Sequence, residues 1–181
     1  IRLSLVGSEM CIRDSLMGPP GSGKSSVGKS LAHKLNLNFC DTDLIIEEMC
    51  KMSISEIFID KGEPFFREIE RTVVLEQLSA GEGILSLGGG SVLDSQTHAA
   101  LSLSQTPVIF LDVSLSSASP RVGFNRDRPL LVGNPRAKWQ ELMNSRRPIY
   151  EELATFTILT DDLTASQVAQ SIADHLGSGV A

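Results

Sequence analysis

The sequence predicts an α/β domain, in which helices cover both faces of a parallel β-sheet. Short apolar runs that suit buried strands alternate with longer segments whose apolar residues recur at helical spacing. This alternation is typical of βαβ units, whose parallel strands are joined by crossover helices. The 181 residues fit one compact domain, and no segment has the composition of a linker.

The first half of the chain carries clear helix-start and helix-stop signals. Ser53 and Glu56 form a capping-box pattern, and Gly62 ends the helix that they open. Pro64 suits the first turn of the next helix. Helices are expected over 25–35, 44–49, 53–62 and 64–78, and strands over 38–40 and 83–87.

The second half repeats the alternation around one polar segment. Residues 123–135 are rich in Arg, Gly and Pro and are expected to form a loop. Pro148 is expected to kink or restart the helix in which it lies. Helices are expected over 94–103, 114–122 and 137–153 and from 164 onward, and strands over 108–111 and 156–159.

The N-terminal segment fits this pattern poorly. A buried strand leading into residue 18 should be a near-continuous apolar run, but Arg13 and Asp14 suit a central strand badly. We therefore expect residues 1–15 to be non-native, as after a cloning or assembly error, and the first strand to be missing. Residues 16–181 would then form the single domain. The alternative is an ordinary variable N-terminus.

Composition excludes several classes of protein. Hydrophobic residues make up 41% and charged residues 21%, as in globular rather than disordered chains. The net charge of −6 offers no general basic surface for nucleic acid, and no apolar run reaches the roughly 18 residues that span a bilayer. Three irregularly spaced cysteines are no disulfide framework. We expect a cytoplasmic protein without nucleic-acid or membrane partners.

Residues 18–25 read GPPGSGKS and fit the phosphate-binding pattern G-x-x-x-x-G-K-[ST] in full. Glycines let backbone N–H groups approach phosphates, and the following helix presents its positive end to them. Lys24 can reach the β- and γ-phosphates, and the Ser25 hydroxyl can bind Mg²⁺. The motif predicts a nucleoside triphosphate site, but it does not separate kinases, GTPases and ATPases. Its candidate binding residues are Gly21, Ser22, Gly23, Lys24, Ser25 and Ser26.

Weaker signals follow three other elements. Asp41 and Asp43 end a strand, where ligands bind in open α/β sheets, although such a pair is often only a helix cap. Arg67 could bind an anion or could pair with Glu63 or Glu70 as an ordinary surface residue. Glycines 88–90 would let a ligand approach the backbone or would form a flexible turn.

Taken in order, the segments GPPGSGKSSVGKSLA, FCDTDLIIE, SISEIF, GEPFFREIE, LSLGGGSV, RDRPLL and RRPIYEELA resemble the shikimate kinase family from residue 16 to about 172. The resemblance implies a P-loop kinase fold with a five-stranded parallel sheet, an acceptor-binding region at about 42–70 and a mobile lid at about 123–135. It also implies transfer of the ATP γ-phosphate to the 3-hydroxyl of shikimate, in aromatic amino-acid biosynthesis. One Mg²⁺ ion and a monomeric enzyme are expected.

The same resemblance implies roles for single residues. Asp43 would bind the shikimate ring hydroxyls, and Arg67 and Arg146 would hold its carboxylate. The R-x-P spacing selects Arg146 over its neighbour Arg147. Gly89 and Gly90 would contact the acceptor through the backbone.

On the nucleotide side, the resemblance implies that Arg121 stacks on adenine and that Arg128, in the lid, reaches the phosphates. Lys24, Asp43 and Arg128 are the expected catalytic residues. Two carboxylates compete for the metal beside Ser25. Asp112 ends an apolar strand as many metal-binding carboxylates do, but the resemblance favours Asp41.

Two rival functions remain. Another small-molecule kinase of the same fold, such as a gluconate kinase, would share residues 18–25 but would not require the other motifs together. A non-catalytic relative that binds a partner protein would not need to retain every polar residue of the site. Shikimate-dependent release of ADP separates these possibilities.

Overall fold

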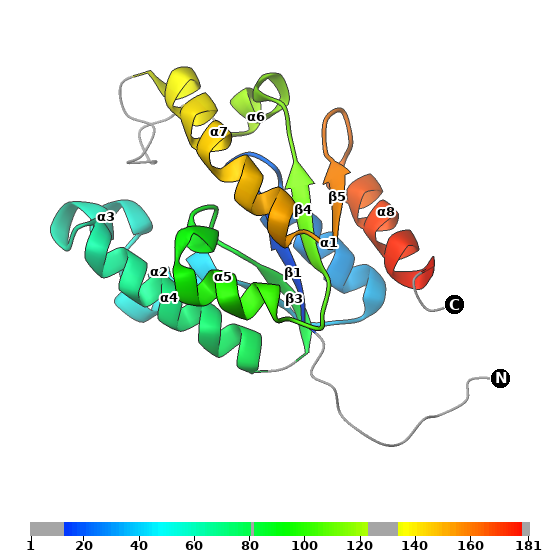
Figure 1. Cartoon of the computed structure of the whole chain (residues 1–181), viewed down its shortest axis with the longest axis horizontal. Coiled ribbons are helices and arrows are strands. Elements are labelled where there is room, and N and C mark those ends of the chain that lie inside the picture. The colour runs from blue at the N-terminus through cyan, green and yellow to red at the C-terminus, as the bar shows by residue number, and fades with distance from the viewer. Residues whose placement is uncertain (1–12, 81, 123–133, 179–181) are drawn as a thin grey trace.

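The expected α/β architecture is confirmed in the computed structural model, which describes residues 13–80, 82–122 and 134–178. A five-stranded sheet has the order β2-β3-β1-β4-β5, and all of its neighbouring strands pair in parallel. Figure 1 shows this sheet with helices packed against it. The strands are β1 (Arg13–Met17), β2 (Phe39–Asp41), β3 (Gly83–Ser86), β4 (Val108–Asp112) and β5 (Phe156–Leu159).

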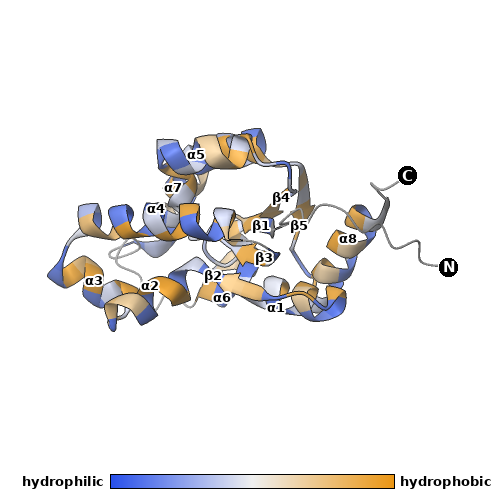
Figure 2. Ribbon diagram, turned by 90° about the horizontal axis from the view of Figure 1, so that it is seen from below, coloured by the Kyte–Doolittle hydropathy of each residue, from blue (hydrophilic) through white to orange (hydrophobic). Residues whose placement is uncertain are grey.

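Helices form the two outer layers. Figure 2 shows α4, α5 and α7 on one side of the strands and α1 and α8 on the other. The helices are α1 (Lys24–Leu35), α2 (Thr42–Cys50), α3 (Ile54–Asp60), α4 (Glu63–Ser79), α5 (Ser95–Ser102), α6 (Leu115–Val122), α7 (Pro135–Leu153) and α8 (Ala165–Ser178), with a short 3₁₀ helix η1 (Ser91–Leu93). The three-layer prediction is therefore confirmed.

Alternate residues of the strands fill two separate cores. On one face, Phe110 and Leu85 pack with Trp139, Met143 and Tyr150 of α7. On the other face, residues of α1 and α8 pack against the strands; this core includes Leu16, Ile109, Leu111, Val27, Leu31, Val168 and Ile172. Burial of both faces explains why β4 is a continuous apolar run from Val108 to Leu111. The sheet is thereby held rigidly beneath the loops at its carboxyl end.

The expectation that the first strand is missing is wrong, because β1 lies at the centre of the sheet between β3 and β4. Every residue but proline has the backbone N–H and C=O that pair strands, and Leu16 and Met17 are fully buried. Asp14 and Ser15 are buried as well, and the Ser15 hydroxyl has no hydrogen-bond partner among the described residues. Burial raises the pKa of Asp14 to about 6. The strand forms, but two of its residues are poorly suited to it.

Two local predictions about helix ends and breaks have different outcomes. The capping box of Ser53 and Glu56 is confirmed at the start of α3. The expected restart at Pro148 is wrong, because α7 continues through it as one helix. Pro148 and Asn144 are exposed residues, and at an exposed site water can replace the N–H partner that the Asn144 carbonyl loses.

Most of the expected loop over 123–135 lies outside the described residues. Its last two residues are described: Asn134 caps α7, and Pro135 is the first residue of that helix.

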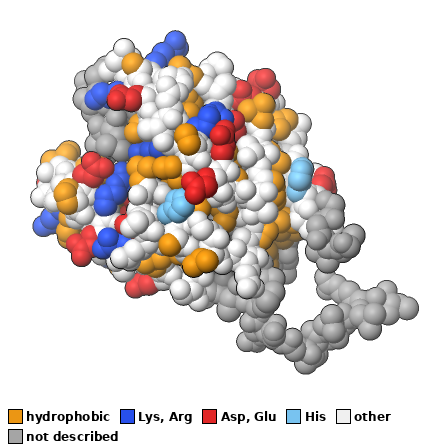
Figure 3. Space-filling model, in the orientation of Figure 1, with side chains coloured by type: hydrophobic (Ala, Val, Ile, Leu, Met, Phe, Trp, Pro, Cys, Tyr) orange, Lys and Arg blue, Asp and Glu red, His pale blue; other side chains and the backbone are white. Residues whose placement is uncertain are grey.

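Among the described helices, none is both long enough and apolar enough to cross a membrane. On the face shown in Figure 3, basic and acidic side chains are interspersed.

Candidate functional site

A cleft of about 410 Å³ opens at the carboxyl ends of the strands, within the usual size range of small-molecule sites. The residues after β1, β2, β3 and β5 all contribute to it. Its lining comprises Pro20, Gly21, Ser22, Gly23, Lys24, Ser25, Ser26, Val27, Asp41, Asp43, Ser86, Leu87, Gly89, Arg121, Thr160, Leu163, Ala165 and Val168. The predicted phosphate-binding residues and both aspartates of the 41–43 segment are thus brought together.

The glycine-rich loop has the conformation that its sequence predicts. Gly21 has a φ of 86°, and an added Cβ there would lie 3.0 Å from the Ala118 carbonyl oxygen, so a side chain would strain the loop. The helix α1 begins at Lys24, which places its positive end at the cleft. Lys24 Nζ donates to the carbonyl oxygens of Gly18, at 2.9 Å, and Pro19, at 3.2 Å.

Asp41 has two partners. Its Oδ2 accepts a 2.6 Å hydrogen bond from the Ser25 hydroxyl, and its Oδ1 accepts a 3.0 Å bond from the Asp43 N–H. The second bond caps α2, so Asp41 is a helix cap, as one of the two interpretations of the sequence expects. The first bond brings together the two oxygen ligands that the sequence analysis expects to hold a metal.

Asp112, the competing carboxylate, is held in a different arrangement. Arg147 donates to both of its oxygens, at 2.7 and 2.9 Å, and the Val113 N–H donates at 2.8 Å. The Arg147 guanidinium lies over the ring of Phe110 at 5.9 Å. Asp112 does not line the cleft. Its charge is therefore neutralised by a bidentate pair to α7.

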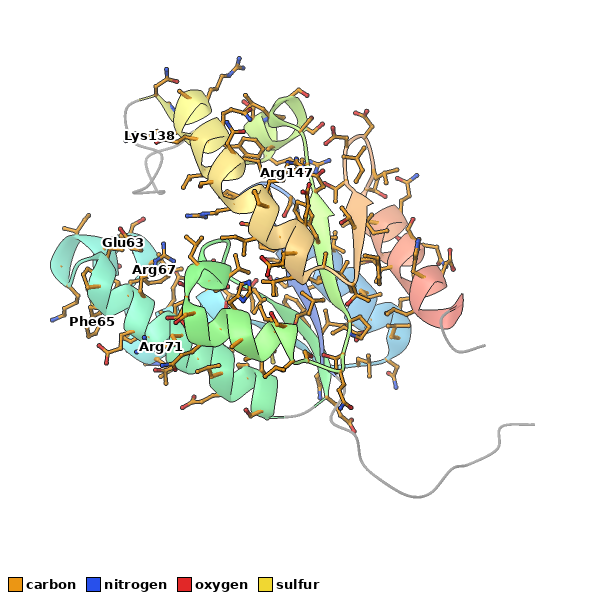
Figure 4. All side chains as sticks on the ribbon, viewed as in Figure 1. Glu63, Phe65, Arg67, Arg71, Lys138 and Arg147 are labelled. Atoms are coloured by element: carbon orange, nitrogen blue, oxygen red, sulfur yellow. The ribbon has the colours of Figure 1, made fainter. Side chains whose placement is uncertain are left out.

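The second group of predicted residues surrounds glycines 88–90. Figure 4 shows Arg67 on α4 one turn after Glu63. Arg67 pairs with Glu63 at 3.1 Å and with Glu70 at 2.6 Å, so both possible partners are engaged. The guanidinium also lies against Gly90, where an added Cβ would come within 2.6 Å of Nη1. Arg67 is therefore not an isolated surface residue, because it packs on the glycine turn.

Glu70 is a site residue that the sequence analysis named only as a possible surface partner of Arg67. It is 3% exposed, and both its Oε1 and the Oδ1 of Asp43 lie beside Gly88. Burial raises the pKa of Glu70, Arg67 lowers it, and Asp43 raises it again. Its position three residues after Arg67 on a helix was the available signal, because such residues share a face.

Arg146 reaches the same turn from α7. Its Nη1 donates to the Gly89 carbonyl oxygen at 3.0 Å, and the Tyr150 hydroxyl donates to that oxygen at 2.5 Å. Arg146 is 4% exposed, and its Nε has no hydrogen-bond partner among the described residues. A buried guanidinium N–H beside a glycine turn suits an anionic ligand.

Of the two arginines predicted to bind the nucleotide, only Arg121 lies among the described residues. Arg121 lines the cleft and donates to the hydroxyl, at 3.2 Å, and the carbonyl, at 2.8 Å, of Thr160. The side chains of Leu163, Ala165 and Val168 add an apolar wall near it. Arg128 lies outside the described residues.

Comparison with known families identifies one match that covers most of the chain. The family model described as shikimate kinase matches residues 20–177. Among curated relatives, a shikimate kinase of Salinispora arenicola is 50% identical over 163 residues, which are 90% of this chain and 96% of the relative. A shikimate kinase of Thermobifida fusca is 44% identical over 89% of this chain and 92% of the relative.

Solved structures agree. A shikimate kinase from Acinetobacter baumannii in complex with shikimate superposes with a TM-score of 0.90 and 34% identity, over 95% of this chain and 96% of that one. A gluconokinase from Sinorhizobium meliloti reaches a TM-score of only 0.54 at 18% identity, over 96% of this chain and all of that one, and it shares the fold alone.

Proposed function

The chain belongs to the shikimate kinase family, and we propose that it transfers the γ-phosphate of ATP to the 3-hydroxyl of shikimate, giving shikimate 3-phosphate and ADP. This reaction belongs to the biosynthesis of chorismate and the aromatic amino acids. We further propose that the enzyme acts as a cytoplasmic monomer and has no nucleic-acid or membrane partner.

The nucleotide side of the cleft would hold ATP. The backbone of residues 21–26 and the positive end of α1 would bind the phosphates, and Lys24 would turn from the Gly18 and Pro19 carbonyls toward them. Arg121 and the apolar wall would receive the adenine. Arg128 would neutralise the transferred phosphoryl group from the lid.

The residues that would hold Mg²⁺ are Ser25 and Asp41. Both are oxygen ligands in contact at 2.6 Å, which suits a hard cation that takes few protein ligands and keeps several waters. Asp41 is a better candidate than Asp112, because both oxygens of Asp112 accept hydrogen bonds from Arg147. When bound, Mg²⁺ neutralises charge on the phosphate oxygens.

The acceptor would lie against glycines 88–90. Arg67 and Arg146 would hold the shikimate carboxylate from two sides of that turn, and the backbone of Gly89 and Gly90 would contact it. Asp43, which lines the cleft beside the turn, would orient the 3-hydroxyl toward the phosphates and accept its proton. Glu70 would hold Arg67 in place by its 2.6 Å ion pair.

The observation that carries this proposal is the convergence of Asp43, Arg67 and Arg146 on one glycine turn beside the phosphate-binding loop. A coupled assay of ADP release tests it, with shikimate, gluconate and no acceptor in parallel. We expect release that depends on shikimate and is at background with gluconate. Turnover with gluconate and not with shikimate would show that the chain acts as a gluconate kinase. Nucleotide binding without turnover of either acceptor would favour a non-catalytic relative.

A further inference from the structure

The helix α7 touches both halves of the site through two aromatic side chains that do not line the cleft. Trp139 Nε1 donates a 2.9 Å hydrogen bond to the carbonyl oxygen of Pro20, within the phosphate-binding loop. The Tyr150 hydroxyl donates to the carbonyl oxygen of Gly89, within the glycine turn. Pro20 and Gly89 both line the cleft, whereas Trp139 and Tyr150 do not.

Both donors are buried and spaced to share one face of α7. They are 2% and 0% exposed, and their positions differ by eleven, which is slightly more than three helical turns and about 16 Å. Met143 lies between them on that face, in the same core. The helix therefore places the Trp139 donor near one end and, near the other, the Tyr150 hydroxyl beside Arg146, whose Nη1 donates to the same Gly89 carbonyl oxygen.

Each bond fixes the orientation of a peptide group. A peptide is planar, so holding the Pro20 carbonyl also fixes the direction of the Gly21 N–H, and holding the Gly89 carbonyl fixes that of the Gly90 N–H. Glycines rotate freely about φ and ψ, so each hydrogen bond from α7 narrows the range of orientations that these peptides sample. Arg146 also donates to the Gly89 carbonyl oxygen, and Tyr150 adds a second bond to it. Burial keeps the Tyr150 hydroxyl protonated, because it raises its pKa to about 12.

The two loops that α7 holds also lie close together. An added Cβ on Gly89 would lie 3.3 Å from the Gly18 carbonyl oxygen and 3.7 Å from Pro20 Cδ. Transfer between two bound reactants requires their reacting atoms to be about 3–3.5 Å apart. A helix that orients both loops therefore helps to set the distance between phosphate donor and acceptor.

We propose that Trp139 and Tyr150 are positioning residues, of which Trp139 orients the phosphate-binding loop for ATP and Tyr150 orients the glycine turn for the acceptor. The inference rests on the proposed function above. Each residue acts through a backbone carbonyl and touches neither substrate. The sequence contains one tryptophan, so substitution at position 139 also removes the chain's tryptophan fluorescence.

The test removes one hydrogen-bond donor at a time. Tyr150→Phe deletes only a hydroxyl, and replacement of Trp139 by 3-benzothienylalanine deletes only the indole N–H at almost constant volume. Trp139→Phe serves as the genetically simpler variant, and the benzothienyl variant keeps the test valid if Trp139→Phe does not fold. Met143→Leu, on the same face but without a donor, is the matched control.

We expect the Trp139 variants to raise the KM for ATP and the dissociation constant for ADP roughly 5- to 10-fold, with little change for shikimate. Tyr150→Phe should raise the KM for shikimate by a similar factor and leave nucleotide binding nearly unchanged. Met143→Leu should change neither value. Calorimetric titration with ADP and with shikimate gives the two dissociation constants separately, and urea unfolding reports stability.

Equal changes in both KM values for both variants, or no change in either, would overturn the inference, because a purely structural helix would affect the two substrates alike. A wild-type chain that binds ADP but shows no shikimate-dependent turnover would instead overturn the proposed function and, with it, the role given to Tyr150. In that case an unaltered ADP affinity in the Trp139 variants would also overturn the role given to Trp139 in orienting the phosphate-binding loop.

Discussion

The Ser25 hydroxyl lies 2.6 Å from Asp41 Oδ2, so the first turn of α1 and the end of β2 meet at one point of the cleft. Asp43 follows two residues later and lines the same cleft. The candidate metal ligand and the candidate acceptor carboxylate therefore come from one short segment. This arrangement underlies the assignment of Asp41, rather than Asp112, to the metal.

Asp41→Asn should sharply weaken the dependence of turnover on Mg²⁺ concentration, because an amide is a poorer ligand for a hard cation than a carboxylate. Asp112→Asn should mainly lower stability, since it breaks the bidentate pair with Arg147. Magnesium titrations of kcat, together with urea unfolding, separate the two effects. The reverse pattern would assign the metal to Asp112 and leave Asp41 as the cap of α2.

Arg67→Ala should impair use of shikimate and spare ATP. Loss of a charge-assisted contact to a carboxylate should cost about 2–4 kcal/mol of transition-state stabilisation, read from kcat/KM for shikimate. Arg71→Ala is the matched control, because Arg71 lies one turn later on α4 and pairs with Asp94 instead (Figure 4). A collapse of ATP affinity with shikimate affinity intact would show that Arg67 serves the nucleotide.

Gly90→Ala should partly reproduce the effect of Arg67→Ala without unfolding the protein. The new Cβ would come within 2.6 Å of Arg67 Nη1, the mobile end of a long side chain, so the guanidinium should move. The KM for shikimate should rise while the melting temperature changes little. Gly177→Ala, where a Cβ meets nothing within 4 Å, should leave KM unchanged. An unchanged KM in Gly90→Ala would argue against contact between Arg67 and the acceptor.

Asp14→Val should stabilise the protein in a pH-dependent way. The folded state holds the Asp14 pKa near 6, above its ordinary 3.8, because the side chain is buried in β1. Below about pH 4 the carboxyl is protonated in both states and imposes no ionisation penalty. As the pH rises from about 4 to 6, the penalty grows to about 2–3 kcal/mol, and above 6 it stays constant.

Urea unfolding of wild type and Asp14→Val between pH 4 and 8 measures this difference. Ser15→Val, which replaces an unpaired buried hydroxyl, is the control, because any stabilisation there should not depend on pH. A constant difference for Asp14→Val across the range would contradict the pKa assignment. A large pH-dependent gain would fit the prediction that residues 1–15 are non-native.

The sequence predicts the architecture well, because the strand and helix periodicities and the phosphate-binding motif are local signals. It fails at β1, where backbone pairing with β3 and β4 outweighs the unfavourable Asp14 and Ser15. It also wrongly allows for a restart of the helix at Pro148, whose exposed position lets α7 continue.

Within the site, the sequence predicts single functional residues, but it does not predict the contacts that hold them in place. The contact of Trp139 with Pro20 joins residues far apart in the chain, and nothing near either one indicates it. Glu70 is a different case, because its helical spacing from Arg67 was visible but its burial was not. Long-range packing decides both contacts, so the structure was needed to find them.

The central claim is most directly tested by identifying the product. Nuclear magnetic resonance of the mixture after complete turnover of shikimate and ATP should show a phosphorus signal coupled to the ring proton at carbon 3, in an amount equal to the ADP released. A phosphorus signal coupled to another ring position would contradict the placement of the 3-hydroxyl at Asp43. ADP accompanied only by inorganic phosphate would contradict the kinase assignment itself.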